Sequence, residues 1–218
     1  MITAVRGRVC IKCGKPLISE DEICVPCRGS PDVSQENCGH SYDRLWMLFP
    51  YTGKYRRLLS SYKFKKNLPL AEFFVRMITE LLNENPLLKD AVIVPVPPRP
   101  GKIKKTGWDQ VDYLVKRLKK KNPEKTVSRC LKRRKSKMQK QLNRKDRLEN
   151  LKDRIYVRNS VTRESSSAAR RFCGSFKVPQ TALVIDDVIT TGSTMEICAK
   201  VLKEAGANKV YGLCLFYD

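Results

Sequence analysis

Three short apolar runs alternate with amphipathic helical patterns, and this alternation constrains the fold more than any other feature of the chain. The runs are AVIVPVP (91–97), TALVIDDV (181–188) and KVYGLCLF (209–216). Continuous apolar runs of this kind are typical of strands that are buried on both faces of a parallel sheet. Apolar residues at helical spacing precede or separate the runs, at 68–85, 109–121 and 193–207. The order predicts an α/β fold, with a mainly parallel sheet flanked by helices.

The second run leads directly into a distinctive turn, VIDDVITTGST (184–194). Asp186 and Asp187 stand at the carboxyl end of the predicted strand, where parallel α/β sheets bind their ligands. The loop that follows leads into a helix, and its backbone N–H groups can form a nest for a phosphate. Gly192 lets the backbone approach a ligand closely. The nest consists of Thr190, Thr191, Gly192, Ser193 and Thr194.

Two adjacent acids cannot bind that phosphate, but they can accept hydrogen bonds from vicinal hydroxyl groups, such as those of a ribose. The stretch therefore predicts acids for a sugar beside a nest for its phosphate. The alternative is a simple helix N-cap next to a solvated pair of aspartates.

The N-terminal part carries two C-x2-C pairs, formed by Cys10, Cys13, Cys24 and Cys27. Two such pairs can place four thiolates tetrahedrally around Zn²⁺. The segment is short and polar, so a structural zinc ion would supply its folding energy. Cys38 and His40 could offer alternative ligands, but four cysteines already saturate a structural site.

These features predict a zinc-binding module at 1–32, a polar linker at 33–45 and an α/β domain at 46–218. No apolar run reaches the ~18 residues of a membrane-spanning helix, and the N-terminus has no apolar segment of signal-peptide length. We therefore expect a cytoplasmic protein without a membrane span.

The chain is strongly basic, with 44 Lys and Arg against 22 Asp and Glu and a formal net charge of +22. Such an excess indicates a polyanionic partner, or else only a solvated basic surface. The densest run, 116–147, has 16 Lys and Arg and two acids. It could bind single-stranded DNA or neutralise the phosphates of a smaller ligand. The candidates are Lys132, Arg133, Arg134, Lys135, Lys137, Lys140 and Arg144.

Aromatic residues also interleave with basic ones between positions 51 and 66, a pattern typical of surfaces that stack nucleic-acid bases. They are Tyr51, Tyr55, Tyr62 and Phe64. We expect two of the four to lie in the core.

The stretch 184–194 resembles the phosphoribosyl pyrophosphate (PRPP) motif of type I phosphoribosyltransferases: apolar residues, two acids and a T-T-G-x-T loop. The resemblance implies that Asp186 and Asp187 hold the ribose hydroxyls as catalytic acids. It also implies that residues 190–194 cradle the 5-phosphate, and that Mg²⁺ accompanies PRPP. VPVPPRPGK (94–102) resembles the pyrophosphate loop of that fold, which implies contacts from Pro98 and Arg99.

The whole chain resembles the ComF/ComFC competence family, in which a four-cysteine zinc finger precedes a phosphoribosyltransferase-like domain. The matching blocks, in order, are CGKPL, YTGKYRRLLSSYKFKKNLPLA, VPVP…GWDQVDYL, QKQLNRKDRLENL and VIDDVITTGST. The resemblance implies a role in natural transformation, in which the protein would bind internalised single-stranded DNA beside a partner helicase. It also implies that 131–150 form a loop that closes on the substrate.

Some positions depart from the family pattern. The usual R-G-F-N-Q reads TGWDQ at 106–110, so Thr106 and Asp109 replace a basic residue and an asparagine. A histidine common in the VPVP loop is Arg99. The stretch 159–179 reads as a longer insert without an assigned role.

Three functions fit these observations. The first is a PRPP-binding protein of DNA uptake, which we expect to be a phosphoribosyltransferase with an unknown acceptor. The second is a nucleobase-salvage phosphoribosyltransferase. The third is a DNA-binding adaptor with a vestigial nucleotide site. Turnover of PRPP with a base would indicate the second, and DNA binding that weakens steeply with salt would indicate the first or third.

Overall fold

The computed structural model describes residues 35–36, 40–134, 155–158 and 178–217. The four cysteines predicted to bind zinc lie outside these residues. So do the basic candidates Lys135, Lys137, Lys140 and Arg144, and most of the predicted insert.

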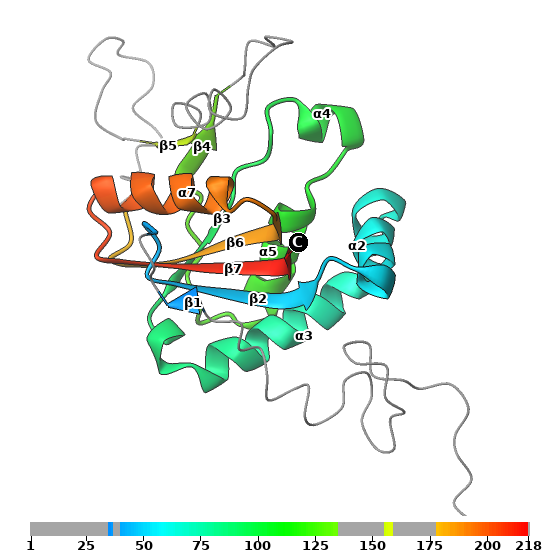
Figure 1. The fold of residues 1–218 in the computed structure, drawn as a ribbon, viewed down its shortest axis with the longest axis horizontal. Helices are drawn as coiled ribbons and strands as arrows, with labels where there is room; N and C mark the ends of the chain where they lie inside the picture. Colours follow the sequence, from blue (N-terminus) through cyan, green and yellow to red (C-terminus); the bar gives the residue numbers. More distant parts are fainter. Residues whose placement is uncertain (1–34, 37–39, 135–154, 159–177, 218) are drawn as a thin grey trace, which may run out of the picture.

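A five-stranded sheet forms the centre of the described domain, in the order β1-β2-β7-β6-β3 (Figure 1). Strands β2, β7, β6 and β3 run parallel, and β1 joins the edge antiparallel to β2. The sheet, flanked by helices, confirms the predicted α/β class and is consistent with a phosphoribosyltransferase-like fold. The bounds are β1 Gln35–Glu36, β2 Arg44–Pro50, β3 Val92–Pro95, β6 Thr181–Ile189 and β7 Lys209–Tyr217.

All three predicted strands are confirmed, as β3, β6 and β7. The sequence did not reveal β2. This strand pairs with β7, and its residues Leu45 to Phe49 are all buried. Its run, RLWMLFP, is rich in long side chains that suit a helix as well as a strand. The predicted linker range also contains Gln35–Glu36, which pair with Arg44 and Leu45. The sheet therefore extends into residues that the composition alone marks as linker.

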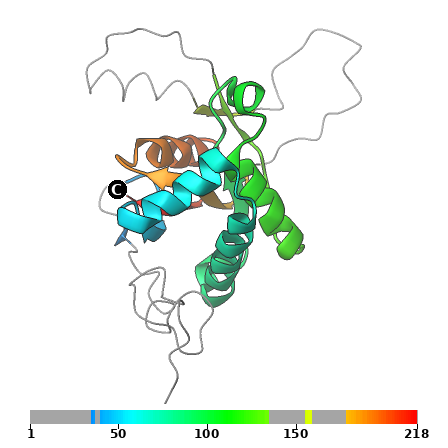
Figure 2. The same ribbon diagram turned by 90° about the vertical axis from the view of Figure 1, so that its right-hand side faces the viewer.

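Helices cover one face of the sheet, and a helix with a small ribbon covers the other (Figures 1 and 2). The first face packs against α2 (Gly53–Lys65), α3 (Pro69–Glu84) and α5 (Gln110–Lys121). The second packs against α7 (Ser193–Glu204). The described residues also form two short helices, η1 (Pro86–Leu88) after α3 and α4 (Lys102–Thr106) after β3.

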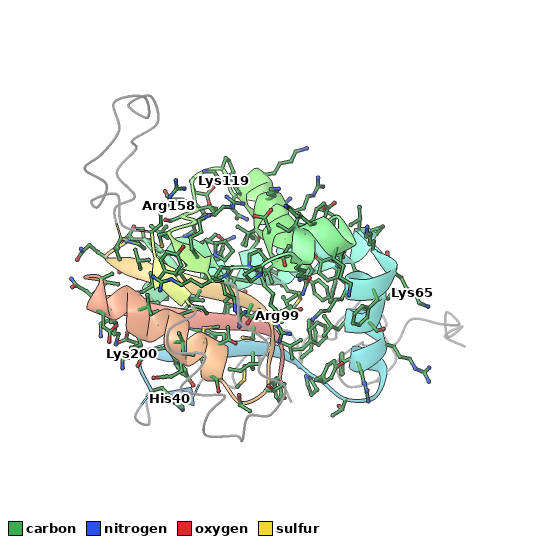
Figure 3. All side chains as sticks on the ribbon, turned by 90° about the horizontal axis from the view of Figure 1, so that it is seen from above. His40, Lys65, Arg99, Lys119, Arg158 and Lys200 are labelled. Atoms are coloured by element: carbon green, nitrogen blue, oxygen red, sulfur yellow. The ribbon has the colours of Figure 1, made fainter. Side chains whose placement is uncertain are left out.

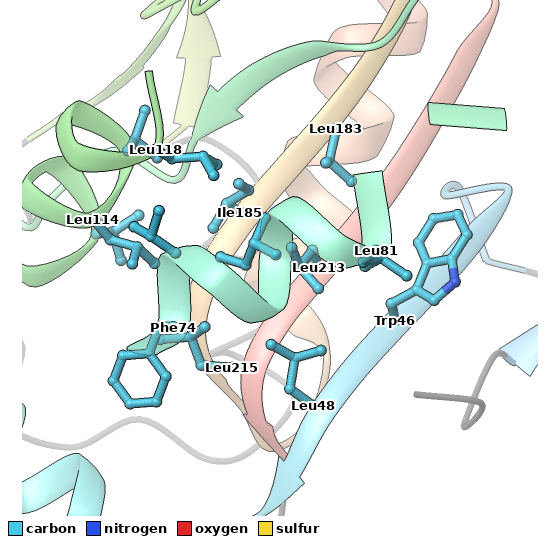
Figure 4. Packing of buried hydrophobic residues seen from close by; sticks show 14 of the residues in the cluster. Trp46, Leu48, Phe74, Leu81, Leu114, Leu118, Leu183, Ile185, Leu213 and Leu215 are labelled. Atoms are coloured by element: carbon cyan, nitrogen blue, oxygen red, sulfur yellow. The ribbon is translucent and has the colours of Figure 1, made fainter. Parts of the chain in front are cut away.

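The larger core lies between the sheet and α3 (Figure 4). Phe73, Phe74, Ile78 and Leu81 of the predicted apolar face are buried there. Aromatic rings continue this core toward the carboxyl end of the sheet, where Phe74 lies 5.4 Å from Tyr62 between ring centroids and 5.8 Å from Phe216. Burial of this face, rather than local propensity, supplies most of the stability of a helix of this length.

A two-stranded ribbon lies beside α7, formed by β4 (Leu131–Arg133) and β5 (Ile155–Val157). Leu131 and Ile155 enter the smaller core, whereas their neighbours Lys132 and Tyr156 pair on the exposed side. The two strands of the ribbon flank residues 135–154, which contain six of the 16 Lys and Arg of the basic run.

The chain that leads into β2 is bound to α7. Ser41 donates from its backbone N–H and its hydroxyl to the Glu196 carboxylate. Asp43 accepts a hydrogen bond from the Val210 N–H and pairs with Lys203 at 3.1 Å. His40 stacks on Tyr42, with 4.7 Å between the ring centroids.

Candidate functional site

The turn from β6 into α7 places the hydroxyl-rich loop at the carboxyl end of the sheet. Gly192, immediately before the first residue of α7, adopts the left-handed conformation (φ 72°). This conformation strongly favours glycine. The first N–H groups of a helix have no intrahelical acceptor, so they are available to a ligand. The Thr191 and Ser193 hydroxyls lie 2.8 Å apart across this turn.

A small hollow opens at this turn, and the side chain of Asp186 contributes to its wall. The predicted phosphate residues Thr190, Thr191, Gly192, Ser193 and Thr194 all line the same hollow. The structure therefore brings the first acid and the complete loop 190–194 together around one hollow.

Asp187 lies on the other face of β6, because successive side chains of a strand point to opposite sides. It is 8% exposed, and its Oδ2 accepts a hydrogen bond from Lys63 of α2 at 2.9 Å. Gln110, the first residue of α5, donates its side-chain amide to the same oxygen. The two acids thus occupy different surroundings, although they are adjacent in the chain.

Gln110 and Asp109 connect this acid to α4, which follows the predicted pyrophosphate loop. Lys102 donates to the side-chain oxygen of Gln110 and pairs with Asp109 at 2.6 Å. The Tyr62 hydroxyl donates to the backbone carbonyl of Gln110 at 2.7 Å. Asp109 also caps α5 by accepting from the Asp112 N–H. Three stretches that are distant in the sequence, 62–63, 102–110 and the end of β6, therefore meet at Asp187.

The two acids differ in charge as well as in position. Burial raises the pKa of Asp186 well above its ordinary value, and the neighbouring charge of Asp187 raises it further. Burial alone would also raise the pKa of Asp187, but Lys63 and Gln110 outweigh this effect and lower it. The negative charge of the pair is therefore held preferentially by Asp187 rather than by Asp186, the acid that lines the hollow.

The predicted pyrophosphate loop follows β3 directly. The Val96 N–H donates to the Ile185 carbonyl, so the loop leaves the sheet next to the two acids. Pro98 is half-buried and Arg99 is exposed; in the view from above, Arg99 lies between α7 and α2 (Figure 3). The Lys102 N–H closes the turn onto the Arg99 carbonyl at 3.0 Å.

Part of the basic run has a structural use. Lys125 is 9% exposed and donates to the carbonyls of Leu88 and Lys89, and Lys119 donates to the carbonyls of Pro123 and Lys125. Arg129 pairs with Asp112. These contacts hold the segment that follows α5 against both ends of that helix and against η1, rather than offer charge to a ligand.

Other candidates of the run lie on the ribbon. Lys132 and Arg134 are exposed, and the Arg134 guanidinium lies 4.8 Å from the centre of the Tyr156 ring. Arg133 is half-buried. Of the four aromatic residues between 51 and 66, Tyr55 and Tyr62 are buried, as expected for two of them, whereas Phe64 is 74% exposed.

Three buried thiols lie near the site: Cys130, Cys198 and Cys214. Burial raises the pKa of each, so they are protonated and unreactive under ordinary conditions. Within the described residues, no group of three or more His, Cys, Asp or Glu could hold a metal ion. The expectation of zinc thus rests on cysteines outside them.

Lys63, Lys102 and Gln110 were not predicted as site residues. Lys63 stands among similar lysines in YKFKK, so the sequence gives no reason to single it out. Gln110 belongs to the block GWDQVDYL, and its position at the start of a predicted helix was the one available sign of a role in the site. Only the packing of α2 and α5 against β6 identifies both as partners of Asp187.

The fold and this site together define a class: an α/β protein with a phosphoribosyltransferase-like sheet and an acidic pair beside a hydroxyl loop. No protein-family model matches the chain. Competence protein ComFC of Streptococcus pneumoniae is 25% identical over 195 residues, covering 89% of this chain and 76% of that protein. Competence protein F of Haemophilus influenzae is 25% identical over 216 residues, covering 94% and 88%. These two similarities, over most of the chain, support its resemblance to the ComF/ComFC family.

Proposed function

We propose that the protein is a PRPP-binding, phosphoribosyltransferase-like protein of competence, acting in the cytoplasm on single-stranded DNA beside a helicase. The observation that carries the proposal is the convergence of Asp186 with the whole loop 190–194 around one hollow. The names of both relatives support the competence role.

In the proposed complex, the 5-phosphate occupies the hollow and accepts hydrogen bonds from the N–H groups and hydroxyls of the loop. The ribose hydroxyls donate to the acids, and Asp187 is already an ionised acceptor. The pyrophosphate lies toward the loop that ends at Lys102, where Arg99 adds positive charge. Mg²⁺ would stabilise the pyrophosphate charge.

The test is calorimetric titration of PRPP with Mg²⁺ into the purified protein. We expect one saturable site, and we expect the double substitution Asp186→Ala, Asp187→Ala to abolish it, because the sugar then loses both acceptors. Lys200→Met, an exposed change on the outer part of α7, is the control. Unchanged PRPP affinity in the double variant would overturn the site assignment.

Turnover decides between the first two functions. Release of pyrophosphate that depends on an added nucleobase would establish a salvage transferase. PRPP binding without such release would leave the competence role in first place.

Surfaces that bind single-stranded DNA combine exposed cations with exposed aromatic rings. The described surface offers this combination on the ribbon, where Lys132 and Arg134 flank Tyr156. It offers a second instance at the end of α2, where the exposed ring of Phe64 lies two positions before the exposed Lys66. Zinc at Cys10, Cys13, Cys24 and Cys27 remains part of the proposal as the structural metal of the N-terminal module.

A further inference from the structure

Asp187 is a buried carboxylate whose hydrogen bonds come from side chains of other elements. Its side chain is 11% exposed, and its Oδ2 atom accepts from two donors. Lys63 approaches from α2 and Gln110 from α5. Two donors from separate helices fix the rotation of a carboxylate, because either bond alone would still allow it to turn.

The two donors are themselves held in place. The backbone of Gln110 accepts from Tyr62, the residue before Lys63, so α2 and α5 are joined at this point. The side-chain oxygen of Gln110 accepts from Lys102, whose charge is balanced by the buried Asp109. With its oxygen bound to Lys102, the Gln110 side-chain amide directs its NH2 group toward Asp187.

We propose that Lys63 and Gln110 are positioning residues for Asp187, holding its carboxylate in place as an acceptor for the ligand's ribose hydroxyl. This inference rests on the proposed PRPP site and goes beyond it, since neither residue belongs to the acidic motif or the hydroxyl loop. Lys63 also balances a charge that burial would otherwise make costly.

The groups that face Asp187 decide how its charge depends on pH. Asp186 is its neighbour on β6 and disfavours a second charge. Lys63 is the cation in direct contact. The remaining ionisable groups nearby are Tyr62 on α2, Lys102 on α4, Asp109 on α5 and Cys214 on β7. Without Lys63, the largest influence that lowers the pKa of Asp187 would be lost and burial would raise that pKa, so the carboxylate would take up a proton at a higher pH than in the wild type.

The experiment compares PRPP affinity from pH 6 to pH 8, about one unit on each side of neutrality, in the wild type and three variants. Lys63→Met removes the cation, Lys63→Arg retains it, and Lys65→Met removes an exposed cation from the same helix. We expect Lys63→Met to weaken binding about tenfold or more, increasingly toward low pH. Affinities are expressed relative to the wild type at each pH, because protonation of the ligand phosphates affects all variants alike.

Rescue by arginine separates positioning from a general loss of structure. We expect Lys63→Arg and Lys65→Met to stay within about threefold of the wild type, with its pH profile. Equal affinity and an equal pH profile in Lys63→Met would overturn the inference. So would tighter binding in that variant, because Lys63 would then compete with the ligand for Asp187.

A second measurement does not depend on PRPP. In the ligand-free protein, ¹³C NMR titration of the Asp187 carboxyl should give a higher pKa in Lys63→Met than in the wild type, and an unchanged titration would overturn the inference. If the wild type fails to bind PRPP at every pH, the proposed function fails, and this titration still decides whether Lys63 controls Asp187.

Discussion

At the scale of single residues, charge is placed where partners from other elements can balance it. Asp43 shows this at the entry to β2, where it accepts the Val210 N–H and pairs with Lys203 and Lys209. Burial alone would raise the pKa of Asp43, but these partners outweigh it and lower the pKa below its ordinary value. Asp43 is therefore a stabilising carboxylate that joins β2, α7 and β7.

Asp43→Asn should destabilise the protein by about 1–2 kcal/mol at pH 7, since the charged partners of the carboxylate remain while its charge is lost. A group with a lowered folded-state pKa contributes stability above its unfolded pKa of about 3.9 and loses it as the pH falls through the folded value. The difference between variant and wild type should therefore be constant from neutral pH to about pH 5 and shrink below about pH 4.

Urea unfolding at several pH values measures this difference. Asp90→Asn, which removes an exposed carboxylate, is the matched control and should change stability little. A deficit in Asp43→Asn that persists unchanged at pH 3, about one unit below the ordinary pKa, would contradict the assigned role.

At the scale of elements, the helix α3 is stabilised by its buried face. Phe74 is fully buried among Phe49, Tyr62, Phe73 and Phe216. Phe74→Ala should cost about 3–5 kcal/mol, because a large cavity would remain in a close-packed ring cluster. Phe64→Ala, the same change at a side chain that is 74% exposed, should stay within about 0.5 kcal/mol. Chemical denaturation of both variants checks the contrast, and equal losses would contradict the assignment of the core.

The sequence predicts elements where one pattern dominates. The amphipathic spacing of α3 and the continuous apolar run of β6 are of this kind, and both are confirmed. It fails for β2, whose apolar residues fit a helix as well as a strand until β7 pairs with them. It also fails for the three-residue strands β4 and β5, which form only because their apolar residues are buried against α7.

The same distinction holds for the site. Asp186 and the loop 190–194 are contiguous, so a motif in the sequence identifies them. Lys63 and Gln110 meet Asp187 only after α2 and α5 pack on the sheet, across 124 and 77 positions of the chain. Contacts of that separation leave no pattern in a single sequence.

At the scale of the whole molecule, the net charge of +22 has two uses. Lys119, Lys125 and Arg129 hold the segment after α5 in place, whereas Lys132 and Arg134 are exposed at the ribbon. The excess of charge therefore overstates the surface available to a polyanion. Among the described residues, no helix has both the length and the apolar character needed to cross a membrane.

Lys132→Gln combined with Arg134→Gln should reduce the salt dependence of single-stranded DNA binding. For every phosphate that the protein no longer neutralises, the slope of log K against log salt falls by about 0.7, so the slope should fall by up to about 1.4. Tyr156→Leu should weaken binding by about 1–3 kcal/mol with the slope retained, because stacking is not a charge effect. Fluorescence anisotropy over a series of salt concentrations measures both, and Lys200→Gln is the control. An unaltered slope in the double variant would place the DNA surface elsewhere.

The pairing of β2 with β7 has a consequence for how the protein is made. Residues 44–50 leave the ribosome long before residues 211–217, yet the two strands are neighbours in the sheet. Until β7 emerges, β2 exposes an apolar edge, and β6 has β3 as its partner but lacks its other neighbour. Native pairings this distant in the chain are slow to form, and they leave the nascent chain prone to aggregation. A chain shortened before β7 would therefore lose the strand that joins β2 to β6, and with it the continuity of the sheet. The pairing of β7 with its two neighbours is thus the step that completes the folding of the sheet.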